Sequence, residues 1–292
     1  MLKTVDKKEK KLYYIKVNRI TIFRKKEDVI MNLKKTLSMI MALTVSATVL
    51  TGCGKKSEST ETPNASDTTE KAALTMATNA EFPPFEYLEN GEIVGADVDI
   101  AEAIAAKLGR ELEITNIDFD AALTGAATGK YDMAVAGITA NDERKKNMNF
   151  SDDYYQASQA IIVMTDSEIV GVADLEGKTI ACQEGTTGEQ YLLDNNYSIQ
   201  SFKTGAEAVT SMTSGKVDAV VIDNAVAKEL SAKQEGATKV LDEALTKESY
   251  AIALQKGDDE LTAEINKALK ELKADGTLAS IFDKYELPYD AE

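Results

Sequence analysis

A turn followed by an apolar strand occurs twice in this chain, and this repeat limits the folds that it can adopt. Residues 128–132 read TGKYD and lead into MAVAGIT, and residues 214–218 read SGKVD and lead into AVVID. In both copies a Gly ends a helical pattern before the strand begins. Residues 74–85 and 178–190 each run from an apolar strand into a loop marked by Pro or Gly. Two lobes built on one plan explain this economically; a duplicated structural turn without functional meaning is the alternative.

Short apolar runs alternate with helical patterns from residue 73 onward. Apolar side chains recur at helical spacing in residues 98–108 and 261–272. The runs expected to form strands are residues 74–77, 133–138, 160–164, 219–222 and 251–254. The alternation predicts an α/β fold with mainly parallel sheet. In such sheets ligands bind beyond the carboxyl ends of the strands, which directs attention to the residues that follow each strand.

The residue inventory excludes several classes of function. The chain has no His and only two Cys, so a zinc cluster, a disulfide framework and a Ser-His-Asp triad are not expected. We expect no metal and no cofactor. The first 52 residues carry twelve bases and four acids, whereas the rest carries 21 bases and 45 acids. This excess of acids does not favour binding to nucleic acid, because such binding depends on Lys and Arg side chains that neutralise phosphates.

The amino-terminal region has the pattern of an export signal. Residues 36–50 form an apolar run too short for an ordinary membrane-spanning helix, and two lysines precede it. The run closes with Leu-Thr-Gly-Cys, which resembles a bacterial lipobox and predicts lipidation of Cys53. The alternative is a buried Cys that happens to follow an apolar stretch. Residues 31–52 are therefore expected to be a lipoprotein signal peptide, and residues 1–30 an extension of the gene model upstream of the true start at Met31.

The segment after Cys53 is polar and has no apolar period. Residues 53–72 are rich in Ser, Thr and Glu, a composition that cannot bury enough surface to fold. We expect a flexible tether that lets the following domain reach outward from a membrane face.

Two charged residues at predicted strand ends stand out. Beyond Cys53 the chain has nineteen Lys but only two Arg. Arg144 follows the strand ending Gly137-Ile138-Thr139, and its planar fork suits a carboxylate. The other arginine, Arg110, is interpreted as a solvated surface residue. Asp223 ends the strand VVID, where it either caps the next helix or accepts hydrogen bonds from an ammonium group.

Further polar and aromatic residues complete the candidate site. The stretch 185–187, Gly-Thr-Thr, offers N–H groups and hydroxyls at a helix start, which suits an anion. Acceptors for an ammonium group together with donors for a carboxylate describe an α-amino-acid zwitterion. Phe82 and Phe119 are candidates for enclosing its side chain, although core packing is the usual role of Phe.

Several segments of the sequence together resemble the pattern of a known family. Residues 78–87 (TNAEFPPFEY), 95–100, 137–144, 150–152, 185–187, 218–223 and 274–277 match, in order, the pattern of family 3 solute-binding proteins of ABC amino-acid importers. The resemblance implies a periplasmic-binding-protein type II fold: two lobes joined by two hinge strands, with the ligand in the cleft. It implies crossings near residues 155–157 and 249–251, hence a first lobe of residues 73–155 plus 250–292 and a second lobe of residues 156–249.

The family pattern also implies roles for individual residues. Arg144 would clamp the ligand carboxylate with Thr139 and Thr187, and Gly137 would offer backbone groups. Asp223 would take the α-ammonium group, and the two aromatic rings would flank the side chain. The ligand-binding residues expected are Asn79, Phe82, Phe119, Gly137, Thr139, Arg144, Thr187 and Asp223. Relatives that prefer basic ligands often have an acid where this chain has Asn79, which weakens the assignment of a cationic ligand.

The function implied is the extracytoplasmic capture of an α-amino acid and its delivery to a membrane permease. The protein is expected to be a monomer on the outer membrane face, anchored through lipid on Cys53, and not an enzyme. Two alternatives remain open. One is an enzyme of the same fold, similar to cyclohexadienyl or arogenate dehydratase, because fold alone does not decide function. The other is a protein that presents its ligand to a separate sensor.

Overall fold

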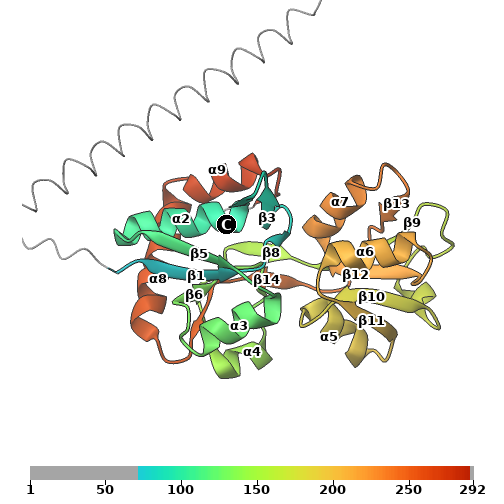
Figure 1. The fold of residues 1–292 in the computed structure, drawn as a ribbon, viewed down its shortest axis with the longest axis horizontal. Coiled ribbons are helices and arrows are strands. Elements are labelled where there is room, and N and C mark those ends of the chain that lie inside the picture. The colour runs from blue at the N-terminus through green and yellow to red at the C-terminus, as the bar shows by residue number, and fades with distance from the viewer. Residues whose placement is uncertain (1–71, 290–292) are drawn as a thin grey trace, which may run out of the picture. The chain divides into compact units, whose positions relative to one another are not determined.

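A computed structural model describes residues 72–289, which lie in one compact unit, Thr68–Glu292 (Figure 1). The predictions about residues 1–71, including the signal peptide and Cys53, fall outside the described residues. Within residues 72–289, no helix has the length and apolar character needed to cross a membrane. In the same residues, no group of three or more His, Cys, Asp or Glu side chains is arranged to hold a metal ion.

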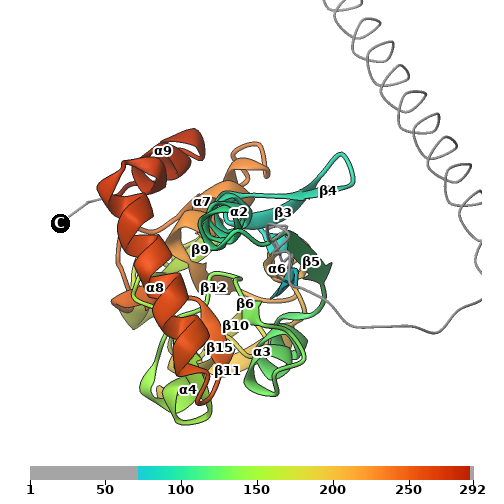
Figure 2. The same cartoon turned by 90° about the vertical axis from the view of Figure 1, so that its left-hand side faces the viewer.

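The first sheet has the strand order β5 (Leu112–Asn116), β1 (Leu74–Thr78), β6 (Met133–Ala134), β15 (Ala253–Gln255) and β7 (Met148–Phe150). Its helices are α2 (Ala96–Leu108), α3 (Phe119–Ala127), α4 (Asp142–Asn147), α8 (Asp259–Ala274) and α9 (Thr277–Lys284). Leu74 and Met76 share an apolar cluster with α2 and α8, whereas Ala77 packs with α3. Figure 2 shows α8 and α9 on the side of this sheet away from α3. The strands are therefore covered on both faces.

A small antiparallel sheet precedes α2 and carries residues of the site. Its strands are β2 (Glu81–Phe82), β3 (Glu86–Glu89) and β4 (Glu92–Val94). Gly95, between β4 and α2, has a φ of 136°, and a Cβ there would collide with the carbonyl oxygen of Phe85. Only Gly permits this close approach, which brings the sheet against the start of α2. We call these elements and those of the first sheet the first lobe.

The second sheet has the order β11 (Ser198–Phe202), β10 (Thr179–Gln183), β12 (Ala219–Asp223), β9 (Gln159–Met164) and β13 (Thr238–Val240). With η1 (Val172–Leu175), α5 (Thr187–Asp194), α6 (Gly205–Thr213) and α7 (Asn224–Ala232), it forms what we call the second lobe. Both sheets have the same plan: three strands pair in parallel, and the next two pairings, made by β15 or β9, are antiparallel. The expectation of mainly parallel pairing is thus only half met, because β9 and β15 enter their sheets from the other lobe.

The repeated turn has the same structural role in both lobes. Gly129 and Gly215 each have a φ of 71°, a left-handed conformation that favours Gly. Asp132 accepts a hydrogen bond from the backbone N–H of Thr75 at 2.8 Å, and Asp218 accepts one from that of Thr179 at 2.8 Å. In each lobe the Asp of the turn therefore holds the beginning of the neighbouring strand.

Two short strands connect the lobes. β8 (Tyr155–Ala157) and β14 (Glu248–Tyr250) pair antiparallel, with Tyr155 opposite Tyr250. Figure 1 shows this pair between the two five-stranded sheets. Both strands lie where the family resemblance implies the crossings; the division of the whole chain into lobes at these points stays a prediction.

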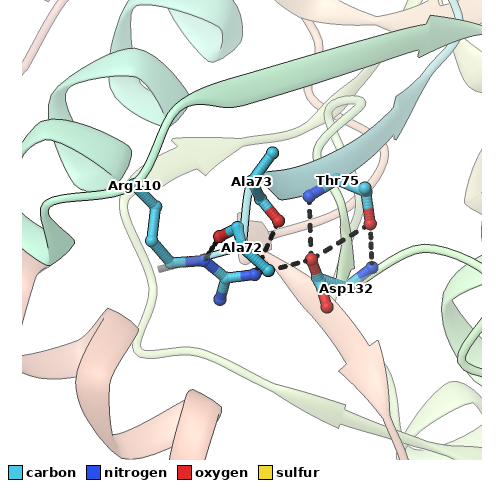
Figure 3. Close-up of polar contacts among 5 residues, drawn as sticks. All are labelled: Ala72, Ala73, Thr75, Arg110 and Asp132. Carbon is cyan, nitrogen blue, oxygen red and sulfur yellow. Dashed lines mark hydrogen bonds and ion pairs between the residues drawn. The ribbon is translucent and has the colours of Figure 1, made fainter. Parts of the chain in front are cut away.

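Arg110 differs from its sequence-based interpretation as a solvated residue. Its side chain is only 15% exposed, and its guanidinium donates to the carbonyl oxygens of Ala72 and Ala73 at 2.8 Å each. It also pairs with Asp132 at 3.0 Å, so that one carboxylate holds both the guanidinium and Thr75 (Figure 3). The arginine thus fixes the residues that precede β1, because three acceptors from two segments of the chain converge on one rigid fork.

Candidate functional site

A narrow cavity lies between the two lobes. Elements of the first lobe supply its lining from the loop after β1, from β2 and β3, and from α3, α4 and the segment after β6. The second lobe supplies the end of β10, the start of α5 and the end of β12. The lining residues are Asn79, Phe82, Glu86, Phe119, Ala136, Gly137, Thr139, Arg144, Gln183, Thr186, Thr187 and Asp223. All eight predicted ligand-binding residues are therefore in one cavity, while their roles remain predictions.

Arg144 is held at the cavity by both lobes. Its Nη1 donates to the carbonyl oxygen of Thr139 at 2.9 Å, and its Nη2 donates to that of Gly185, in the second lobe, at 3.0 Å. The guanidinium carbon lies 5.5 Å from the centre of the Phe119 ring, within range of a cation–π contact. Asn141 caps α4 by accepting from the N–H of Arg144 at 2.8 Å. Contacts within the protein thus fix the orientation of this side chain.

The two predicted threonines are joined by an acid that the sequence did not single out. The Oγ1 atoms of Thr139 and Thr187 donate to the same oxygen, Oε2 of Glu248, at 2.6 and 2.7 Å. Glu248 lies on the crossing strand β14, so its carboxylate bridges both lobes at the hinge. Each hydroxyl has a single hydrogen. These threonines can therefore donate to a ligand carboxylate only by releasing Glu248.

Asp223 is buried, with 4% of its surface exposed, at the point where β12 meets α7. It occupies the N-cap position of α7, but its side chain makes no capping hydrogen bond. Instead its Oδ1 accepts from the hydroxyl of Tyr250 at 2.5 Å. Burial, and then the nearby charge of Glu248, raises the pKa of Asp223 to about 7, while the bond from Tyr250 opposes this shift. The carboxylate is thus available to a cation rather than used as a cap.

Asn79 and Gly137 are already hydrogen-bonded within the protein. Asn79 donates to the carbonyl oxygen of Ile117 at 3.1 Å and accepts from Gln183 across the cleft at 3.1 Å. The N–H of Gly137 donates to the buried carboxylate of Asp97 at 2.8 Å, so it is not free for a ligand. Gly137 has a φ of 54°, and a Cβ there would lie 2.7 Å from the ring of Phe82. Gly is thus required where the ring closes the cavity.

Glu86 is a second acid at this site that the sequence analysis missed. It lines the cavity with no surface exposed, and neither of its carboxyl oxygens accepts a hydrogen bond from the described residues. Burial, followed by the charge of Asp97, raises its pKa well above the usual range. Its partner is the carboxyl of Asp97, with which it shares a side-chain hydrogen bond. An acid with a strongly raised pKa in a cavity wall is a candidate for a binding role. Its one sequence signal was an acid directly after the apolar run FPPF, at the end of a matched motif.

Comparison with known proteins gives a consistent picture. Residues 74–288 match the bacterial extracellular solute-binding proteins, family 3. The arginine-binding extracellular protein ArtP of Bacillus subtilis is 33% identical over 87% of this chain and 98% of its own length. Two solved structures of an ancestral arginine-binding protein, one bound to glutamine and one to arginine, superpose with a TM-score of 0.70. They are 42% and 41% identical, covering 73% and 74% of this chain and 97% and 99% of theirs.

Proposed function

Because this chain belongs to the bacterial extracellular solute-binding proteins of family 3, and so binds an amino acid for an ABC importer, we propose that its ligand is an α-amino acid with a cationic side chain. The observation that carries the proposal is the excess of acids in the cavity wall, where Glu86 and Asp223 line the cavity with a single cation, Arg144. The two-lobed fold of the solute-binding proteins, expected from the sequence, is confirmed by the solved relatives.

The charges of the cavity support this choice of ligand. Among the described lining residues, Arg144 is the one cation, and Glu86 and Asp223 are the acids. An α-amino-acid zwitterion matches Arg144 with its carboxylate and Asp223 with its ammonium group. One acid, Glu86, is then left to face the ligand side chain. Glu86 and Asp97 share a side-chain hydrogen bond, and the negative charge of this buried pair is one that a guanidinium or ammonium group would compensate.

The presence of Glu86 also changes how Asn79 bears on the choice between a basic and a neutral ligand. The absence of an acid at position 79 argued against a basic ligand, but Asn79 is engaged by Ile117 and Gln183. The acid that a basic side chain needs is supplied from β3 instead. The names of several relatives, which describe arginine-binding proteins of Bacillus subtilis and Escherichia coli, agree with this assignment.

A ligand screen tests the proposal. The full-length protein would be heated with each of the twenty amino acids, with ornithine and with citrulline, since a ligand raises stability by mass action. Arginine, lysine or ornithine should raise the melting temperature most, by several degrees at a hundredfold excess over Kd. A neutral or acidic amino acid as the strongest ligand, with no shift from the basic ones, would refute the cationic assignment while leaving amino-acid binding intact.

The proposal also includes how the protein is exported and how it is attached to the membrane. Membership of an extracellular family implies a place outside the cytoplasm and a permease partner. We propose that residues 31–52 are a signal peptide, that lipid on Cys53 anchors a monomer to the membrane, and that residues 53–72 act as its tether. Replacement of Cys53 by Ser should release the protein into the medium.

We further propose that the chain is a binding protein and not a dehydratase. The relatives in the comparison are binding proteins. The cavity residues match the charges of an intact amino acid, which favours retention over conversion. Incubation with arogenate or prephenate, followed by NMR, should show no product; phenylalanine or phenylpyruvate formation would contradict this assignment.

A further inference from the structure

Three threonine hydroxyls converge on one carboxylate at the hinge, that of Glu248 on β14. The Oγ1 atoms of Thr139 and Thr187 donate to its Oε2 at 2.6 and 2.7 Å, and Oγ1 of Thr246 donates to its Oε1 at 2.7 Å. Glu248 is buried, with 8% of its surface exposed. A carboxylate removed from water needs hydrogen-bond donors in exchange, so the three hydroxyls replace the water that Glu248 has lost.

The position of this carboxylate is set by the backbone of the hinge. Residues 138–140 pair with residues 249–251, and Thr139 lies opposite Tyr250 in an antiparallel bridge. Glu248 is thereby fixed to the segment that carries Thr139, whereas Thr187 belongs to the second lobe. The carboxylate thus joins a hydroxyl beside its own strand to a hydroxyl from across the cleft.

These bonds decide what the two cavity threonines can offer to a ligand. A threonine hydroxyl has one hydrogen and two lone pairs, and in both Thr139 and Thr187 the hydrogen is directed at Glu248. The Oγ1 of Thr187 also accepts from Gln159 at 3.3 Å, which leaves it one lone pair. Both threonines line the cavity, where they can therefore accept a hydrogen bond but not donate one. An ammonium group suits such a pair of acceptors, and a carboxylate does not.

The charges near the threonines agree with this polarity. Arg144 directs two N–H groups at carbonyl oxygens, and its guanidinium has others with which to hold a ligand carboxylate. Burial lowers the pKa of Arg144, and the charges of Glu248 and then of Asp223 oppose this shift. The charge of Glu248 also acts on Asp223. Glu248 therefore adds negative charge close to the acid that is proposed to take the α-ammonium group.

We propose that Glu248 is a positioning residue, which turns the hydroxyls of Thr139 and Thr187 into acceptors for the α-ammonium group of the ligand. The ligand carboxylate is then held by Arg144 without these hydroxyls, which differs from the roles that the family pattern implies for them. The inference rests on the proposed function, since it requires an α-amino acid in this cavity. It does not depend on the charge of the ligand side chain.

Three ligands that share one side chain test which end of the amino acid the hydroxyls serve. They are arginine, agmatine, which lacks the carboxylate, and 5-guanidinopentanoic acid, which lacks the ammonium group. Calorimetry of the full-length protein gives their affinities, by displacement with arginine for the weaker two. Thr139→Val and Thr187→Val should each weaken arginine and agmatine by about tenfold relative to 5-guanidinopentanoic acid.

A matched control comes from the third threonine. Thr246 donates to the same carboxylate but does not belong to the described residues that line the cavity. Thr246→Val removes a hydroxyl from Glu248 as the other two variants do, and it should leave the ratios between the three ligands unchanged. An altered ratio in this variant would mean that the ratios report the loss of a donor to Glu248 rather than a contact with the ligand.

A second comparison tests whether Glu248 acts through the hydroxyls. In Glu248→Ala the hydroxyl of Thr187 is free to rotate and to donate to the ligand carboxylate. Thr187→Val made in that background should therefore no longer disfavour the two ligands with an ammonium group. A purely structural role of Glu248 would give the same ratios in both backgrounds, and that result would overturn the positioning role.

The other outcomes also decide. If the threonine variants weaken arginine and 5-guanidinopentanoic acid but spare agmatine, the hydroxyls donate to the carboxylate and the inference is wrong. Equal losses for all three ligands would show that the hydroxyls serve only the closure of the lobes, which also overturns it. If Thr187→Val does not fold, Thr139→Val and its combination with Glu248→Ala provide the same comparisons.

Failure of the proposed function gives a different result. Arginine and lysine would then not bind the wild-type protein, whereas another amino acid would. The inference would be tested in the same way with the amine and the des-amino acid of that ligand.

Discussion

The two arginines of residues 72–289 have different tasks, although both use the planar fork that lysine lacks. Arg110 joins Ala72, Ala73 and Asp132 within the first lobe. Arg144 spans the cleft and lines the cavity. The first holds segments of one lobe together, and the second is the one proposed to contact the ligand. Their chemistry is identical, so the surroundings alone decide which role each has.

Alanine substitutions should separate these two tasks. Arg144→Ala should leave the cooperative unfolding of the protein in place but weaken binding of its amino acid at least ~100-fold, because two charge-assisted hydrogen bonds are worth ~3–6 kcal/mol together. Arg110→Ala should instead lower the free energy of unfolding by ~1–3 kcal/mol and keep the affinity. Calorimetry measures the affinity of both variants, and urea denaturation measures their stability. Loss of binding in Arg110→Ala but not in Arg144→Ala would contradict this division of tasks.

Asp223 should make the stability of the ligand-free protein dependent on pH. An unfolded Asp ionises near pH ~4, whereas the pKa of the folded carboxyl is about 7. Between these values the folded state binds more protons, so the free energy of unfolding falls as pH rises, by ~4 kcal/mol in all for this group. Asp223→Asn should show a flatter profile from pH 4 to 7, since its oxygen can still accept from Tyr250. Identical slopes would show that Asp223 is ionised at low pH.

At the scale of elements, the repeated turn explains the internal similarity of the sequence. The same Gly conformation and the same Asp-to-strand bond recur in both lobes. The bonds are local to each lobe and do not reach the cavity. The role of the turn itself is therefore structural, as the alternative interpretation held. The two sheets nevertheless share one strand order, so the lobes do follow one plan.

Removal of the turn carboxylates should destabilise the lobes unequally. Asp218→Ala loses the bond to Thr179, at a cost of ~1 kcal/mol. Asp132→Ala loses the bonds to Thr75 and also leaves Arg110 without its ion pair, so ~2–3 kcal/mol is expected. Urea denaturation measures both. Equal losses would mean that Arg110 finds another partner.

For the whole molecule, the contacts that cross the cleft indicate a closed arrangement. Gln183 donates a hydrogen bond to Asn79, and Arg144 donates one to the carbonyl oxygen of Gly185. Glu248 accepts a hydrogen bond from one threonine hydroxyl of each lobe. A ligand shifts an equilibrium between open and closed forms only through its greater affinity for one of them. Because it holds a threonine hydroxyl of each lobe, Glu248 favours closure without ligand. A ligand carboxylate that uses these hydroxyls, as the predicted roles require, would have to displace it.

Glu248→Ala should shift the ligand-free protein toward the open form. Hydrogen exchange of the backbone amides in residues 183–190 should then be faster than in the wild type, because these amides lose their cover. A saturating ligand should remove most of the difference. Glu229→Ala, the same substitution at an exposed position of α7, should show no change. Unaltered exchange in Glu248→Ala would mean that the other cross-cleft contacts suffice for closure.

The sequence by itself indicated the α/β class and the repeat, which follow from local periodicity and turn chemistry. Motifs at strand ends, together with the family resemblance, indicated eight of the residues that line the cavity, and the resemblance alone implied crossings near β8 and β14. The tertiary structure decided what depends on neighbours distant in the chain. Arg110 is largely covered because Ala72 and Asp132 come to it, and Glu86 meets Asp97 because β3 folds onto α2. Burial and the choice of hydrogen-bond partners are properties of packing, which no local pattern around a single Glu or Arg encodes.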